Sequence, residues 1–152
     1  MGTYTTRHLT SDRTIPLVIE PANPNITHGG FTDLLQGRND EFKRLLLEHG
    51  ALLFRNFPVN NPDDFASVIR HLNVGSFLDY KGGDSPRVKV SEGVFTSTEA
   101  PPWLQILLHN ELSYSSHYPS HILFYCDIEP VERGQTPIAD ARKVFRAIDP
   151  KI

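Results

Sequence analysis

The sequence has 152 residues, which is enough for one compact domain with a hydrophobic core and too few for two domains of ordinary size. Hydrophobic residues make up 39% of the chain, charged residues make up 22%, and the formal net charge is −3. These values are typical of a soluble globular protein and exclude an intrinsically disordered chain. Because the sequence has no block of Lys and Arg, it argues against nucleic acid as a partner.

Cysteine usage and hydropathy indicate where such a protein works. Cys126 is the only cysteine, so no internal disulfide can form and a reducing compartment is the simplest expectation. No stretch approaches the roughly 20 apolar residues of a membrane span, and the N-terminus lacks the apolar core of a signal peptide. We therefore expect a cytoplasmic protein without a membrane partner.

The first third of the chain changes from an irregular to a helical pattern. Residues 1 to 37 are rich in Thr, Pro, Asn and Gly, so we expect an irregular N-terminal segment in which TIPLVIEP (14–21) is the one plausible strand. From Asn39 the spacing of Phe and Leu predicts a helix, which Gly50 ends. The apolar run ALLFRNF (51–57) then predicts a short strand.

The middle of the chain begins with a well-marked helix. Asn61 is a favourable N-cap, and Pro62 follows in the first helical position. The apolar side chains at helical spacing, which we expect to form its buried stripe, are Phe65, Val68, Ile69 and Leu72. Beyond it, RVKV and GVFTS are short strand candidates among loops rich in Gly and Pro.

Two apolar runs and a final helix complete the predicted elements. The runs LQILLHNEL (104–112) and HILFYCDI (121–128) are short and rich in branched or aromatic residues, which favours buried strands with Cys126 as a small core residue. A last helix begins after Asp140 and ends before Pro150. Without regular alternation of strands and helices, this order predicts an α+β or mostly β domain.

The segment HNE within the first of these runs carries the chemistry. On a strand, residues two apart share one face, so His109 and Glu111 project together while Asn110 points away. An imidazole and a carboxylate on one face are two of the three ligands of the two-His-one-carboxylate site that binds non-haem Fe(II). A His-x-Glu alone is weak, since a solvated Glu beside a hydrogen-bonded His explains it equally well.

The flanking segments resemble the TauD/TfdA superfamily of Fe(II)- and 2-oxoglutarate-dependent dioxygenases, in its clavaminate-synthase-like branch with His-x-Glu. The resemblance runs from about Asp40 to the end and rests on GALLFRNFPV, on YKGGDSPRVKVSEGVFTSTEAPPWLQILLHNELSY, on ILFYCDIEP and on RGQTPIADARKVF. Several stretches in the right order are more specific than one motif. We therefore divide the chain into the N-terminal segment 1–37 and residues 38–152, the N-terminal part of a TauD/TfdA-like domain.

This resemblance implies a partial double-stranded β-helix, or jelly roll, behind the N-terminal helices, with later strands missing. It implies Fe(II) held by His109 and Glu111, and 2-oxoglutarate as co-substrate, contacted by Thr136 in the Gly-x-Thr-Pro segment. In such enzymes 2-oxoglutarate is oxidised to succinate and carbon dioxide while O2 oxidises a small molecule, usually by hydroxylation. Candidates for substrate contacts are Thr96, Asn110 and Arg87. For Arg87 the alternative is a surface ion pair.

The family also needs a distal His as the third iron ligand and an Arg for the far carboxylate of 2-oxoglutarate, and the sequence has neither in the expected place. His117 or His121 as the missing ligand, in a cupin-like metal protein, is the less favoured alternative. Arg142 and Arg146, four residues apart, are better interpreted as the solvated face of the last helix. Strands that are not closed into a barrel expose their edges, so we expect self-association through those edges. The alternative to an oxygenase is a catalytically inactive relic or a half-domain that binds a partner chain.

Overall fold

The N-terminal half of the protein is built on a small mixed sheet. The computed structural model describes residues 3–78, 87–97, 101 and 103–151. Strands β1 (Tyr4–Thr10) and β2 (Arg13–Pro21) form an antiparallel hairpin, and β3 (Leu52–Phe54) adds to β2 in parallel, giving the order β1-β2-β3. The parallel pairing places Val18 opposite Leu53, so that the apolar run of β2 lies in the centre of the sheet.

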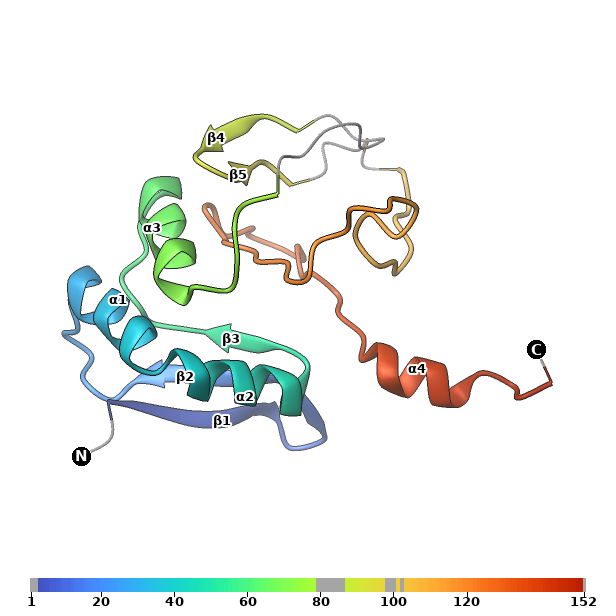
Figure 1. The fold of residues 1–152 in the computed structure, drawn as a ribbon, viewed down its shortest axis with the longest axis horizontal. Helices are drawn as coiled ribbons and strands as arrows, with labels where there is room; N and C mark the ends of the chain where they lie inside the picture. The colour runs from blue at the N-terminus through green and yellow to red at the C-terminus, as the bar shows by residue number, and fades with distance from the viewer. Residues whose placement is uncertain (1–2, 79–86, 98–100, 102, 152) are drawn as a thin grey trace.

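Three helices pack on this sheet or on one another, and together they bury its apolar face. They are α1 (His28–Gly37), α2 (Asn39–His49) and α3 (Pro62–Leu72); α1 and α2 lie over the strands, and α3 packs against α1 (Figure 1). The buried side chains that form the core between helices and sheet are Ile19, Phe31, Leu34, Leu35, Phe42 and Val68. Since this core draws on all three helices and on β2, burial of its apolar surface is what holds the unit together.

The ends of these helices follow from the sequence. The side chain of Asn61 accepts a hydrogen bond from the Asp64 amide at 2.8 Å, which satisfies one of the free N–H groups at the start of α3. Gly50 ends α2 with a φ of 78°, in the left-handed region where glycine carries no steric penalty. The predicted helix from Asn39, its end at Gly50 and the N-cap at Asn61 are therefore confirmed.

The interpretation of residues 1 to 37 as irregular is wrong. TIPLVIEP does form a strand, as β2, but the Thr-rich residues before it form β1, and α1 follows. The three glycines of α1 lower its intrinsic helix propensity, and burial of Phe31 and Leu35 outweighs that cost. The core joins residues from both sides of the predicted boundary after residue 37, and this domain boundary stays a prediction.

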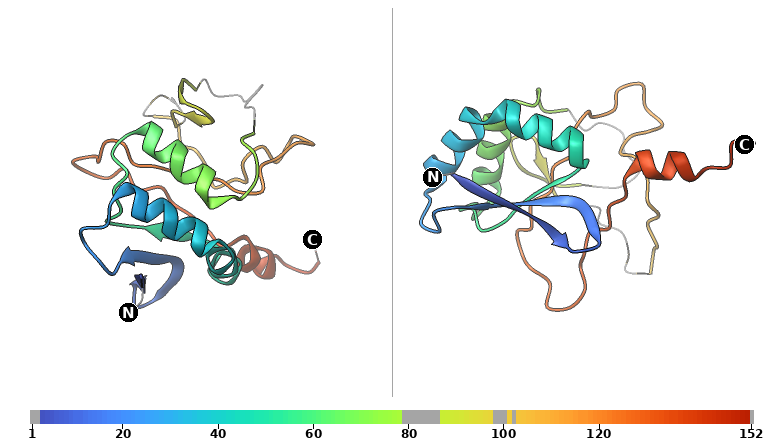
Figure 2. Two further views of the ribbon diagram at one scale, coloured as in Figure 1. Left: turned by 60° about the vertical axis from the view of Figure 1, so that its left-hand side comes forward. Right: turned by 90° about the horizontal axis from the view of Figure 1, so that it is seen from below.

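Beyond α3 the described chain has little regular structure. Strands β4 (Lys89–Ser91) and β5 (Val94–Phe95) form a short antiparallel hairpin next to α3, where RVKV and GVFTS predicted strands. Helix α4 (Ala141–Ala147) begins after Asp140 as predicted, and it lies on the far side of the molecule from α3 (Figure 1). From residue 103 to residue 140 the chain forms no helix or strand, and parts of it loop away from the packed N-terminal half (Figure 2).

The two strands predicted for 104–112 and 121–128 do not form. Both ranges are described in full, and both are coil and turn, because neither finds a hydrogen-bonded neighbour in the described chain and a strand is stable only when paired. Their apolar side chains are consequently exposed. Residues with half or more of their surface exposed are Leu104, Ile106, Leu107, Leu108, Ile122, Phe124 and Ile128.

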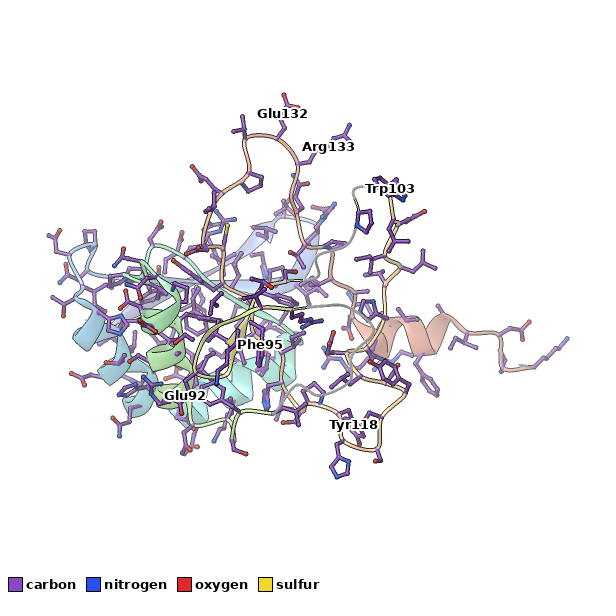
Figure 3. All side chains as sticks on the ribbon, turned by 90° about the horizontal axis from the view of Figure 1, so that it is seen from above. Glu92, Phe95, Trp103, Tyr118, Glu132 and Arg133 are labelled. Atoms are coloured by element: carbon purple, nitrogen blue, oxygen red, sulfur yellow. The ribbon has the colours of Figure 1, made fainter. Side chains whose placement is uncertain are left out.

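One further packing prediction for this half is wrong, because Cys126 is exposed. Trp103 is 85% exposed and lies on a loop that projects from the body (Figure 3). The loops that carry Tyr118 and Glu132 with Arg133 also project (Figure 3). The described residues thus make an α+β protein without a closed barrel, whose packed core lies in the N-terminal half. No helix within the described ranges has the length and apolarity needed to cross a membrane.

Candidate metal centre

Two consecutive turns carry the HNE segment. The amide of Ser113 donates to the carbonyl of Asn110 at 3.3 Å, and the amide of Ser115 donates to that of Leu112 at 2.9 Å. Between them Leu112 has a φ of 52° and is 9% exposed, so a buried side chain fixes the turn directly after Glu111. The chain reaches this geometry through a turn, which corrects the prediction of a strand with alternating side chains.

His109 and Glu111 nevertheless face each other. Nε2 of His109 lies 3.8 Å from Oε2 of Glu111, with 57% of the His side chain and 18% of the Glu side chain exposed. The other ring nitrogen, Nδ1, lies 2.7 Å from the carbonyl oxygen of Leu107. A carbonyl only accepts, so this contact places a proton on Nδ1, and in the neutral imidazole the lone pair is then on Nε2, the nitrogen that faces the carboxylate.

The second oxygen of Glu111 has a different partner. Arg87 donates from one terminal nitrogen to Oε1 of Glu111 at 3.0 Å, and only 20% of its side chain is exposed. The residue after it, Val88, is bonded on both sides to Thr96: its amide donates to the Thr96 hydroxyl at 2.9 Å, and its carbonyl accepts from the Thr96 amide at 2.8 Å. The hairpin therefore fixes the backbone from which Arg87 reaches the carboxylate.

The donor set of this pair fits a divalent metal ion. Nitrogen and carboxylate ligands bind such ions at about 2.1 Å, so two ligands of one ion lie no more than about 4.2 Å apart, and 3.8 Å is within that limit. Metal-binding His residues commonly donate their second ring nitrogen to a carbonyl, as His109 does. In the described parts of the chain, however, no group of three His, Cys, Asp or Glu side chains is placed to hold a metal.

The remaining candidates do not join the pair. Thr136 is exposed, and no hydrogen bond or ion pair among the described residues connects it to His109 or Glu111. Asn110 is exposed with its carbonyl in the first turn, and Thr96 uses its hydroxyl within the hairpin.

His117 and His121, the alternative third ligands, are not gathered with His109 and Glu111 into a group of three metal ligands in the described part of the chain. Nδ1 of His117 lies 3.0 Å from the hydroxyl of Ser116, and Nδ1 of His121 lies 3.0 Å from that of Ser120. Arg142, interpreted above as part of a solvated face, instead donates to the carbonyls of Leu47 and Glu48 at the end of α2.

Comparison with known proteins identifies the family. The model of the taurine catabolism dioxygenase TauD, TfdA family matches residues 7–152. This chain belongs to that family. It is 38% identical over 141 residues to a clavaminate synthase-like protein of Arabidopsis thaliana, a match that covers 90% of this chain and 42% of the relative. It is also 38% identical over 108 residues to the dapdiamide synthesis protein DdaC of Enterobacter agglomerans, covering 71% of this chain and 32% of the relative.

The TauD/TfdA match extends the resemblance seen in the sequence. That resemblance began at about Asp40, whereas the family match begins at residue 7 and so includes most of β1, β2 and α1. The chain spans well under half of the length of the two relatives, so the activity of a whole protein of this kind is a proposal here. Part of the stretch YKGGDSPRVKVSEGVFTSTEAPPWLQILLHNELSY, on which that resemblance partly rests, lies outside the described residues. This part includes Gly82 and Gly83.

The sequence alone does not identify the partner of Glu111. Arg87 was predicted to be a substrate contact or part of a surface ion pair, and in the structure it forms a largely buried ion pair with Glu111, the predicted metal ligand. A physical signal was available, because a carboxylate in an apolar stretch requires a countercharge when no metal is bound. The position of that countercharge, 24 residues earlier in the chain, depends on the tertiary structure.

Proposed function

We propose that this chain carries the first two iron ligands of an Fe(II)- and 2-oxoglutarate-dependent oxygenase. The observation that carries the proposal is the facing of His109 Nε2 and Glu111 Oε2 at 3.8 Å, in a chain of the TauD/TfdA family. His109, with its proton held on Nδ1, would offer a nitrogen lone pair, and Glu111 would offer one carboxylate oxygen. Two ligands leave the other positions of an iron ion for a third ligand, the co-substrate and oxygen.

The residues of the chain would bind and orient, while the cofactors supply the redox chemistry. When bound, iron and 2-oxoglutarate supply the activation of O2, coupled to oxidation of the co-substrate to succinate and carbon dioxide. Thr136 is the proposed contact for a carboxylate of 2-oxoglutarate, because the residue is exposed and a hydroxyl can donate to an anion. Thr96 and Asn110 stay proposed substrate contacts.

The proposed substrate is a small molecule, such as an amino acid or a precursor of a secondary metabolite. The name of one relative, a dapdiamide synthesis protein, supports a role in making a small molecule. We further propose the jelly roll of the family for the whole protein, and the cytoplasm as its compartment, since a single exposed thiol is compatible with reducing conditions.

Succinate release tests the proposal. The protein is supplied with Fe(II), 2-oxoglutarate and O2, and succinate is measured with and without candidate amino acids. We expect succinate to form, and to be lost in His109→Ala and in Glu111→Gln but not in Arg44→Met, which removes an exposed charge on α2. Equal succinate formation by His109→Ala, or no formation together with no metal uptake, would exclude this function for the chain.

A second function, as a catalytically inactive half-domain that binds a partner chain, has its own support. The apolar side chains between residues 103 and 148 are exposed to an extent that is unusual for a soluble monomer. Light scattering at several protein concentrations measures the association directly. A monomer at every concentration would refute self-association, and an oligomer without turnover would favour the half-domain over the oxygenase.

A further inference from the structure

Arg87 contacts Glu111, whose metal-binding role is proposed above, through one of the two carboxylate oxygens. The two oxygens of Glu111 have different neighbours: Oε1 accepts from Arg87 at 3.0 Å, and Oε2 faces His109 at 3.8 Å. The guanidinium and the imidazole thus lie on different oxygens of one carboxylate. Fewer than a quarter of the surface of either the Arg87 or the Glu111 side chain is exposed, so water competes weakly for this bond.

Both ends of this contact are held in place. On one side the two hydrogen bonds between Val88 and Thr96 fix the backbone next to Arg87. On the other side the buried Leu112 fixes the turn next to Glu111. A Glu side chain has several rotatable bonds, and a charge-assisted hydrogen bond to one oxygen restricts them, so the other oxygen keeps its direction toward His109.

We infer that Arg87 is a positioning residue for the metal centre: it holds Oε1 of Glu111 so that Oε2 remains available, beside Nε2 of His109, as a single-oxygen ligand for a divalent cation. The inference rests on the proposed function, because it assumes that His109 and Glu111 bind the metal. It adds a specific role for a residue that the sequence suggested as a substrate contact or as part of a surface ion pair. Hydrogen-bond partners of metal-ligating carboxylates commonly change metal affinity by 10–100-fold when removed.

The opposite effect of the same residue is also physically possible, which makes the direction of the change decisive. A guanidinium repels a divalent cation, and removing it would tighten binding if repulsion were the larger effect. Arg87 contacts Oε1, whereas the metal ion would bind at Oε2 beside His109. The negative carboxylate therefore lies between the guanidinium and the cation. We therefore expect the orienting effect to dominate.

Titration with Co(II), which is stable in air and has visible absorption, tests the inference without any enzymatic turnover. Calorimetry and the absorption band give the affinity for the protein, Arg87→Met, Arg87→Lys, His109→Ala, Glu111→Gln and the control Arg44→Met. We expect Arg87→Met to weaken binding about tenfold or more, Arg87→Lys to lose less because an ammonium still donates to Oε1, and Arg44→Met to change nothing. Adding Arg87→Met to Glu111→Gln should weaken binding no further, since the two residues act through one contact.

The outcomes separate the inference from the function on which it rests. Unchanged or tighter Co(II) binding by Arg87→Met, with weaker binding by His109→Ala, refutes the positioning role and leaves the metal site standing. Unchanged binding by His109→Ala and Glu111→Gln refutes the metal site and the inference together. Should Arg87→Met fail to fold, as judged by circular dichroism, Arg87→Gln, which is neutral and too short to reach Oε1 as Arg87 does, takes its place: a Co(II) affinity equal to that of Arg44→Met refutes the inference.

Discussion

Replacing Leu35 with Ala tests whether the N-terminal half is the stable core of this protein. Leu35 lies in α1 with none of its surface exposed, in contact with the cluster that includes Ile19, Phe31 and Phe42. Leu47, in α2, is 78% exposed and provides the same substitution on the surface of a neighbouring helix. The comparison separates burial from any general effect of replacing a leucine in a helix.

The size of the effect follows from the burial of the side chain. Changing Leu to Ala removes about three carbon groups, which at ~0.8 kcal/mol each cost about 2.4 kcal/mol in lost transfer free energy. A cavity adds to this cost, because neighbours as completely buried as Ile19 and Phe31 have little room to collapse. We expect Leu35→Ala to lower the free energy of unfolding by about 3–4 kcal/mol, and Leu47→Ala to change it by less than about 0.5 kcal/mol.

Urea unfolding followed by far-ultraviolet circular dichroism measures this difference, because α1, α2 and α3 dominate the helical signal. With a slope of about 2 kcal/mol per molar urea, the midpoint of Leu35→Ala should fall by about 1.5–2 M. Equal midpoints for Leu35→Ala and Leu47→Ala would show that the helices do not pack on the sheet as described, and the reasoning would be refuted.

Two further changes test other contacts. Tyr4→Phe removes the hydroxyl that donates to Glu41 at 2.6 Å and that holds the pKa of this carboxyl below its usual 4.5. A lowered carboxyl pKa stabilises the fold fully above about pH 4.5, and this stabilisation is lost as the pH falls from there through the lowered pKa. The difference in urea midpoint between protein and variant should therefore shrink from about pH 7 to about pH 3, and a constant difference would contradict this. Burial, and then Glu41, raise the pKa of the Tyr4 hydroxyl to about 12, so the same difference should also shrink as the pH rises above about 10. The ring of Tyr125 stacks on that of Phe65 with ring centres 5.4 Å apart, and its hydroxyl donates a 3.3 Å hydrogen bond to the carbonyl of Val59. Tyr125→Ala, but not Tyr125→Phe, should speed limited proteolysis of the surrounding coil, because only Ala removes the ring. Equal rates for the two variants would show that the ring contact does not hold this segment.

The metal ligands of the candidate site could be predicted from the sequence, but the way the chain brings them together could not. His109 and Glu111 could be selected from the motif and its flanks, because ligand identity is chemical and is written in the residues. The strand that was expected to bring them together does not form, and a turn fixed by Leu112 does so instead. The pairing of Arg87 with Glu111 could not be predicted, since it joins two segments whose approach depends on the path of the whole chain.

The sequence by itself determined the local elements whose signals lie within a few residues. The N-cap of α3, the glycine end of α2 and the start of α4 after Asp140 depend on backbone hydrogen bonds that one side chain or one φ angle settles. It also determined the α+β class and, through the segments around HNE, the family.

Only the tertiary structure decided which apolar segments are buried. The glycine-rich α1 and the Thr-rich β1 are ordered by the core and by β2, although their own propensities are weak. The apolar runs 104–112 and 121–128 have strong strand propensity and remain coil, because a strand needs hydrogen bonds from another segment and none is paired with them in the described chain. Burial and strand pairing depend on distant parts of the chain, and no local pattern contains that information.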